Sequence, residues 1–180
     1  IDPETIVKVY KNPNSIDEIV RERERARKAF ILGVPTAISY DIVQVGNLYG
    51  SVFEMLDAKS FAELLKEGES INKLVKQSVG ILKQIHSIEN LNDDLPKKRD
   101  EAIGWAKFCK DYLPKEIGNK LVKMMEEIPD TNTIIHGDFH IKNIMHTDKE
   151  NLLIDMETIA VGHPILELAC SYSIYEGFEC

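Results

Sequence analysis

The stretch of sequence that decides the fold is residues 136–143, HGDFHIKN, and Asp155 follows twelve positions after its last residue. Within this stretch Asp138 and Asn143 stand five positions apart, so a loop can bring both side chains to one magnesium-phosphate site. In such a site an aspartate accepts the proton of an attacking hydroxyl group, and an asparagine oxygen ligates the metal ion. We therefore expect Asp138 to be the catalytic base and Asn143 to be a metal ligand.

A β-hairpin is predicted directly after this loop. The apolar residues 144–145 and 152–154 flank the turn residues 147–151, which is the pattern of two short strands with a tight connection. The second strand leads into Asp155, so the hairpin returns a carboxylate toward Asn143. Magnesium takes one or two carboxylates together with phosphate oxygens. The spacing therefore predicts Asp155 as the second metal ligand.

These motifs resemble the catalytic loop and metal segment of the aminoglycoside phosphotransferase family, a small-molecule branch of the protein-kinase-like fold that includes choline kinase relatives. The resemblance rests on residues 136–143, on IDME at 154–157 and on GHPILELA at 162–169, where Glu167 replaces the usual aspartate. Gly137 stands where protein kinases usually carry arginine, which favours the small-molecule branch. The resemblance implies transfer of the γ-phosphoryl group from ATP, with Mg²⁺, to a hydroxyl of an aminoglycoside-, choline- or sugar-like acceptor.

The resemblance extends to the first part of the chain. Lys8 looks like the strand lysine that contacts the phosphates of the nucleotide. Glu22 looks like its partner on the following helix, because its spacing from the apolar helix residues puts it on the inward face. The segment FEML at 53–56 resembles the hinge whose backbone binds adenine. The nucleotide-binding residues that the resemblance implies are Lys8, Glu22, Glu54, Met55 and Leu56.

The patterning along the whole chain predicts an α+β protein, and the resemblance implies that its fold is two-lobed and protein-kinase-like. Residues 1–54 have the pattern of a strand, a helix capped by Asn14 or Ser15, and two strands, and we expect them to form a partial small lobe. Residues 55–180 are mostly helical in pattern and are expected to form the α-rich large lobe, with the catalytic loop and the metal segment. In the family a glycine-rich loop precedes the lysine strand and further helices follow Ala169, so we expect truncation at both ends.

Composition restricts the partners of the protein. The 180 residues are 43% hydrophobic and 29% charged, which is typical of a globular chain. The net charge of -8 argues against a nucleic-acid partner and is compatible with a cationic small-molecule substrate. No apolar run approaches the roughly 18 residues that cross a bilayer, so no membrane association is expected. The three cysteines, Cys109, Cys170 and Cys180, indicate free thiols in a reducing compartment such as the cytoplasm.

Three other functions compete with the small-molecule kinase. A non-catalytic, kinase-like module would bind nucleotide or metabolite without turnover, although the loop retains both aspartates and the asparagine. A protein kinase is disfavoured by Gly137. A metallohydrolase would use His136, His140 and His146 with Asp138 as metal ligands, but it leaves the loop asparagine without a role.

Several histidines and one glutamate have structural alternatives to a role in chemistry. We expect His136 to hold the catalytic loop through a backbone hydrogen bond, and His86 and His163 to be structural. His140 is expected either to pack within the loop or to contact phosphate or substrate. Glu157 is expected either to be a further metal or substrate ligand or to cap the loop.

Overall fold

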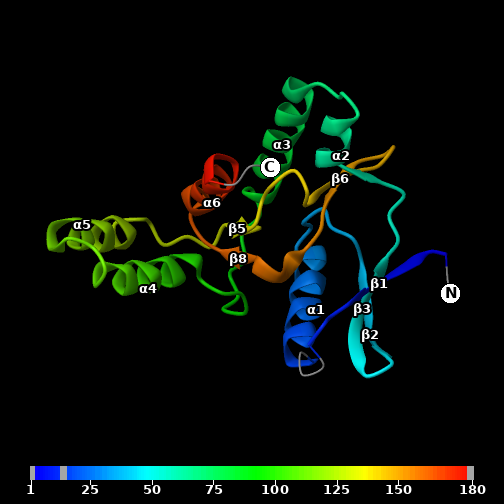
Figure 1. Cartoon of the computed structure of the whole chain (residues 1–180), viewed down its shortest axis with the longest axis horizontal. Coiled ribbons are helices and arrows are strands. Elements are labelled where there is room, and N and C mark those ends of the chain that lie inside the picture. Colours follow the sequence, from blue (N-terminus) through cyan, green and yellow to red (C-terminus); the bar gives the residue numbers. More distant parts are fainter. Residues whose placement is uncertain (1–2, 13–15, 178–180) are drawn as a thin grey trace. The chain divides into compact units, whose positions relative to one another are not determined.

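The computed structural model of the protein describes residues 3–12 and 16–177 and has an α+β architecture (Figure 1). Its elements divide between two compact units. Within the described ranges, the first unit comprises residues 3–12, 16–85 and 140–158, and the second comprises residues 86–139 and 159–177. The α+β class is therefore confirmed, whereas the lobe boundary expected after Glu54 stays a prediction.

The first unit begins with a three-stranded antiparallel sheet in the order β1 (Thr5–Val9), β3 (Leu48–Glu54) and β2 (Ser39–Val45). The turn between β2 and β3 contains Gly46, whose φ of 64° is a left-handed conformation that glycine adopts without steric cost. β1 pairs with β3 so that Lys8 lies opposite Ser51. The predicted first strand and the two strands predicted after the helix are confirmed.

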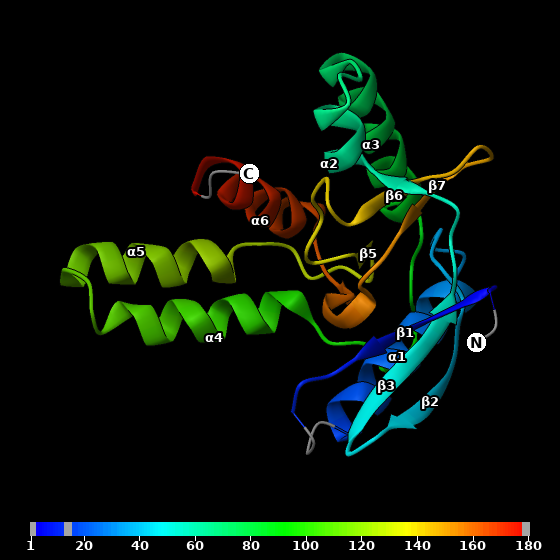
Figure 2. The ribbon, with the colours of Figure 1, turned by 45° about the vertical axis from the view of Figure 1, so that its right-hand side comes forward.

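The helix α1 (Ile16–Ile31) packs against this sheet (Figure 2). Its buried residues recur at steps of three and four, as one face of a helix requires, and are Ile19, Glu22, Ala26 and Ala29. The helix ends before Gly33, which has a φ of 87° and donates its N–H to the Phe30 carbonyl at 3.0 Å. The expected caps at its start, Asn14 and Ser15, lie outside the described residues. The inward position predicted for Glu22 is confirmed.

The rest of the first unit consists of short strands and two helices. In chain order they are β4 (Lys59–Ser60), α2 (Phe61–Lys66), α3 (Ile71–Ile85), β6 (Ile144–His146), β7 (Asn151–Leu153) and the 3-10 turn η1 (Met156–Thr158). β4, β6 and β7 form a second antiparallel sheet, and η1 packs against α1. β6 and β7 are the hairpin that the sequence predicts after residues 136–143.

The second unit contains a helical hairpin and a further helix. α4 (Lys98–Lys110) and α5 (Lys115–Glu126) lie side by side (Figures 1 and 2). The two-residue strands β5 (Ile134–Ile135) and β8 (Ala160–Val161) pair antiparallel, and α6 (Pro164–Gly177) follows. The residue patterns at 102–112, 116–128 and 133–135 predict α4, α5 and β5. No pattern predicts α6, because its apolar residues surround the helix and leave no periodic stripe.

Each unit has an apolar core of its own. Fully buried side chains in the first unit are Ile19, Phe61, Ile85, Ile144 and Leu153, and those in the second are Ile134, Ile135 and Ile159. Within residues 3–12 and 16–177, none of the helices combines the length and the apolar character that a membrane crossing requires.

Gly50, in the middle of β3, has no room for a side chain. A substitution there tests how closely β1 pairs with β3. A Cβ at this position would lie 2.7 Å from Val7 Cγ1 and 3.0 Å from the Lys8 carbonyl oxygen. Gly50→Ala should therefore displace β1 and lower the free energy of unfolding by roughly 1–3 kcal/mol, as measured by urea denaturation.

Gly80→Ala on α3 is the matched control, because a Cβ there meets nothing within 4 Å. Alanine has the higher helix propensity, so this variant should be as stable as the wild type or more stable by up to about 1 kcal/mol. Equal stability of the wild type and of both variants would contradict the close pairing of β1 with β3.

Candidate active site

The first unit contains a cavity of about 460 Å³. Its apolar lining comes from the sheet, α1 and the β6–η1 region and includes Ile6, Ala26, Ala37, Phe53, Met145, Ile154 and Met156. The charged residues that line it are Lys8, Glu22, Glu54, Glu63 and Asp155. A mostly apolar cavity with a few convergent polar groups is the usual form of a small-molecule site.

The ammonium of Lys8 lies between two carboxylates at this cavity. Its Nζ atom is 2.7 Å from Glu22 Oε1 and 3.4 Å from Asp155 Oδ1. The side chain of Glu22 is 4% exposed, whereas those of Lys8 and Asp155 are each 41% exposed. Burial by itself would lower the pKa of Lys8, but the hydrogen bond to Glu22 and its negative charge outweigh burial and raise this pKa above the usual range. Lys8 therefore stays a cation at neutral pH and is suited to bind an anion.

The backbone around Asp155 is fixed on both sides. The φ of Asp155 is 65°, a left-handed conformation that no other non-glycine residue among the described ones adopts. On one side the Ile154 N–H donates to the Asn143 carbonyl at 3.0 Å, and on the other Arg25 of α1 donates to the Glu157 carbonyl. Strained backbone of this kind is concentrated at functional sites. The hairpin thus places the two predicted metal ligands on adjoining chain segments.

The donor set of Asp155 and Asn143 fits magnesium. Both side chains offer hard oxygen atoms, and magnesium is commonly held by one or two carboxylates while substrate oxygens and water complete its shell. Zinc instead needs three or four ligands, mostly nitrogen and sulfur. Across the part of the chain that the structure describes, no group of three or more His, Cys, Asp or Glu side chains is placed to hold a metal ion. The ligand set of the metallohydrolase alternative is therefore not assembled among these residues.

Residues 54–56 line the cavity, and part of their backbone is already hydrogen-bonded. The Glu54 N–H donates to the Ile38 carbonyl at 3.0 Å, and the Met55 N–H donates to the Glu4 carbonyl at 2.8 Å. Among the described residues, no backbone acceptor binds the Leu56 N–H. Of these three residues, Leu56 thus has the N–H that a ligand can use.

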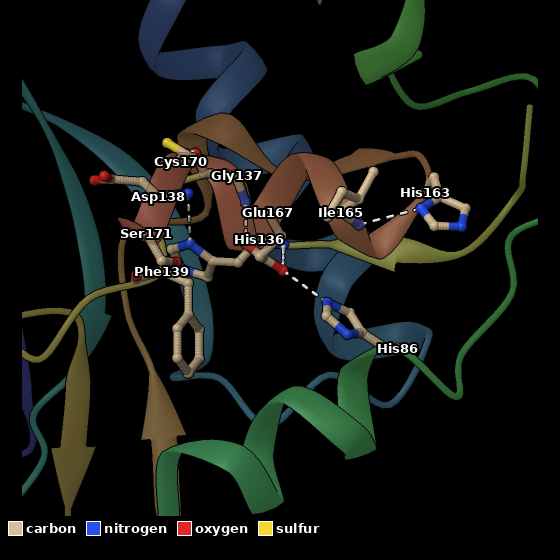
Figure 3. Close-up of polar contacts among 10 residues, drawn as sticks. All are labelled: His86, His136, Gly137, Asp138, Phe139, His163, Ile165, Glu167, Cys170 and Ser171. Carbon is tan, nitrogen blue, oxygen red and sulfur yellow. Dashed lines mark hydrogen bonds and ion pairs between the residues drawn. The ribbon is translucent and has the colours of Figure 1, made fainter. Parts of the chain in front are cut away.

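In the second unit, one buried carboxylate binds the start of residues 136–143 (Figure 3). Glu167 of α6 is 1% exposed and accepts the N–H groups of His136 at 3.0 Å and Gly137 at 2.7 Å. Its Oε2 atom also lies 3.1 Å from Nε2 of His86. Because buried N–H groups must be paired, this carboxylate fixes the backbone immediately before Asp138.

The backbone of Asp138 itself is held by its neighbours. Its N–H donates to Nδ1 of His136 at 3.2 Å, and the next carbonyl, that of Phe139, accepts the Ser171 hydroxyl at 2.8 Å. Figure 3 shows the Asp138 carboxylate pointing away from the His136 ring. Hydrogen bonds of the main chain therefore set the position of Asp138, and its carboxylate points away from the His136 ring.

The histidines have the structural roles that the sequence suggests. A ring nitrogen of His136, His140 and His163 accepts, in each case, the backbone N–H two residues further along. His86 pairs with Glu167. The structural interpretation of His86, His136 and His163 is confirmed, and His140 makes its loop contact, while a phosphate contact of His140 and the role of Glu157 stay untested.

The described cysteines also match expectation. Cys109 and Cys170 are free thiols. The Cys170 thiol donates to the Gly137 carbonyl at 3.4 Å, and burial raises the pKa of this thiol, so it stays protonated at neutral pH. Cys180 lies outside the described residues.

The predicted site residues are distributed over the two units. Lys8, Glu22, Asp155 and residues 54–56 line one cavity, and Asn143 is joined to the segment before Asp155. Asp138 belongs to the second unit, because the boundary falls between Phe139 and His140. The catalytic, nucleotide-binding and metal-binding roles of these residues remain predictions.

Three contacts at the site escape the sequence analysis. The Tyr10 hydroxyl binds Glu22, and Arg25 binds the Glu157 carbonyl in η1. Glu167 binds the backbone at the start of residues 136–143. Periodicity could have indicated two of them, since Tyr10 is two residues after Lys8 on a strand and Arg25 is three after Glu22 on a helix. The contacts of Glu167 join positions about thirty residues apart, which no local pattern reveals.

Comparison with known proteins decides the family. Residues 2–179 match the sequence model of the phosphotransferase enzyme family. The chain belongs to this family. The resemblance seen in the loop and in the metal segment is thereby confirmed.

Solved structures of similar proteins share the fold. An aminoglycoside phosphotransferase from Streptomyces rimosus, in complex with ADP and streptomycin, superposes with a TM-score of 0.66 at 15% identity, over 97% of this chain and 72% of that one. A choline/ethanolamine kinase family protein from Mesorhizobium loti gives a TM-score of 0.58 at 12% identity, over 100% of this chain and 61% of that one. The protein-kinase-like fold is therefore confirmed.

A curated relative matches this chain over part of its own length. Acyl-CoA dehydrogenase family member 11 of Pongo abelii is 25% identical over 194 residues, which cover 92% of this chain. The chain spans about a quarter of the length of this relative.

The contacts of Glu167 make its removal costly. Glu167→Ala leaves the buried N–H groups of His136 and Gly137 without their acceptor, which should lower the free energy of unfolding by about 2–4 kcal/mol in urea denaturation. Glu176→Ala, on the exposed side of the same helix, should change it by less than about 0.5 kcal/mol. Equal stability of the two variants would mean that Glu167 does not fix the loop.

Proposed function

We propose that the protein is an ATP-dependent, magnesium-assisted phosphotransferase that moves the γ-phosphoryl group to a hydroxyl of a small molecule. The observation that carries this proposal is the position of Lys8 between Glu22 and Asp155 at the edge of a mostly apolar cavity. A fixed cation beside an apolar cavity suits a ligand that is flat and apolar at one end and anionic at the other. Family membership supports the same reaction class.

The cavity is proposed to hold the nucleotide. Its apolar lining would contact the base, and the Leu56 N–H would donate to it, because the Met55 N–H already binds Glu4. Lys8 would bind the phosphates, and Glu22 would hold the ammonium in place. The ADP in the Streptomyces rimosus structure supports a nucleotide for a protein of this fold.

Asp155 and Asn143 are proposed to hold Mg²⁺. When bound, the ion would neutralise phosphate charge and orient the phosphates for transfer. Asp155 is the charged ligand, and its fixed backbone keeps the carboxylate at the cavity beside Lys8. Asn143 would add its neutral side-chain oxygen. Its backbone carbonyl accepts the N–H of Ile154, which holds the two segments together.

Asp138 is proposed to act on the acceptor. Its carboxylate would orient the hydroxyl and take its proton as the acceptor oxygen bonds to the γ-phosphorus. The bond between that phosphorus and the β,γ-bridging oxygen breaks, and ADP leaves with the bonding electron pair. Because Glu167, His136 and Ser171 fix the backbone around Asp138, little reorganisation is needed at this step.

The acceptor class is proposed to be a hydroxyl compound with positive charge. The net charge of -8 favours a cation, and the similar solved structures include a streptomycin complex and a choline/ethanolamine kinase family protein. ATP consumption with a panel of cationic, neutral and anionic hydroxyl compounds tests this class, and a response only to neutral or anionic compounds would overturn it.

Substitutions of Asp138 and of Asp155 should have different effects. General-base contributions are roughly 10²–10⁴ in rate, so Asp138→Asn should lose turnover on about that scale while nucleotide affinity stays near that of the wild type. Asp155→Ala should lose both turnover and the gain in ATP affinity that magnesium gives. Titration of ATP with and without Mg²⁺ measures the affinity, and ADP release measures the turnover.

Asp148→Asn is the matched control, because Asp148 lies exposed in the turn between β6 and β7. It should behave as the wild type in both assays. Turnover retained in Asp138→Asn would exclude Asp138 as the base. Wild-type protein that binds Mg·ATP but turns over no acceptor would favour the non-catalytic, kinase-like module.

A further inference from the structure

Tyr10 lies where the strand of Lys8 continues past the end of β1. Its N–H donates to the Tyr49 carbonyl at 3.0 Å, so the pairing with β3 extends to this residue. Side chains two positions apart on a strand point to the same face. Lys8 and Tyr10 therefore share the face that meets Glu22 on α1.

The carboxylate of Glu22 divides its two oxygens between these residues. Oε1 accepts Nζ of Lys8 at 2.7 Å, and Oε2 accepts the Tyr10 hydroxyl. Since Glu22 is 4% exposed, water has little access to supply either bond. Burial and the hydrogen bond to Glu22 raise the pKa of Tyr10 to about 12, so the phenol keeps the proton that it donates.

The phenol also limits where the ammonium can go. Lys8 Nζ lies 5.3 Å from the centroid of the Tyr10 ring, within the range of a cation–π contact. Without the hydroxyl, Oε2 would lose the donor that binds it in the described part of the chain, and the ammonium, which already binds Oε1, could move to bind both oxygens. Such a shift toward Glu22 would draw Nζ away from Asp155, which is now at 3.4 Å.

We propose that Tyr10 is a positioning residue for Lys8: its hydroxyl occupies the second oxygen of Glu22, so that the ammonium stays directed toward the cavity and the phosphates. Tyr10 is not among the residues that line the cavity, so it acts through Glu22 and not by contact with the nucleotide. This inference rests on the proposed nucleotide-binding function.

The test measures the affinity for Mg·ATP by calorimetric titration in four variants of the full chain. Tyr10→Phe keeps the ring and removes only the hydroxyl, and it should weaken binding roughly three- to tenfold, the range that corresponds to one ordinary hydrogen bond. Tyr49→Phe, on the neighbouring strand, should stay within about twofold of the wild type, because no side-chain contact of this hydroxyl links it to Glu22 among the described residues. Thermal melts of each variant show whether the fold is retained.

Lys8→Met and the double variant Tyr10→Phe/Lys8→Met distinguish positioning from general support. If Tyr10 acts through Lys8, the tyrosine substitution should change affinity by less than about twofold once the lysine is gone. A loss that persists in the Lys8→Met background overturns the inference, as does unchanged affinity in Tyr10→Phe. Wild-type protein that binds no Mg·ATP would overturn the proposed function and the inference with it, whereas the two preceding results overturn the inference alone.

Discussion

A carboxylate buried at Glu22 needs hydrogen-bond donors, because a buried charged or polar group without partners is costly. The donors come from the strand opposite, as the ammonium of Lys8 and the hydroxyl of Tyr10. These contacts require that β1 pairs with β3 in its observed register and that the face of α1 that carries Glu22 packs against the sheet. The same ammonium reaches Asp155, so the sheet, α1 and the metal segment depend on one group of charges.

The second unit also contains a buried carboxylate that is held by hydrogen-bond donors. Glu167 is buried on α6, and its donors are two consecutive backbone N–H groups and the ring of His86. In the first unit the buried carboxylate positions a side chain, whereas in the second it positions the main chain that carries Asp138. Groups that must act within a few tenths of an ångström are held by such supporting contacts. Both glutamates therefore serve the proposed chemistry without taking part in it.

The sequence predicts those features of the site that depend on local spacing. The loop at 136–143, the hairpin that returns Asp155 and the inward position of Glu22 follow from distances along the chain and from helical periodicity. The helix α6 was not predicted, since apolar residues on all its sides hide the period. The contacts of Glu167 with His136 and Gly137 join residues about thirty positions apart, so only the folded chain reveals them. The resemblance of residues 53–56 to the hinge does not distinguish Met55 from Leu56, and only the structure shows that the Met55 N–H is already bound by Glu4, which precedes β1.

The central claim is that the cavity of the first unit binds nucleotide between residues 54–56 and Lys8. The most direct measurement is a titration of the ¹⁵N-labelled protein with Mg·ADP, followed by amide chemical shifts in NMR spectra. The account predicts that the amides of Lys8, Leu56 and Asp155 shift in a saturable way while those of the α4–α5 hairpin do not. Saturable shifts confined to the α4–α5 hairpin, or none at millimolar Mg·ADP, would contradict it.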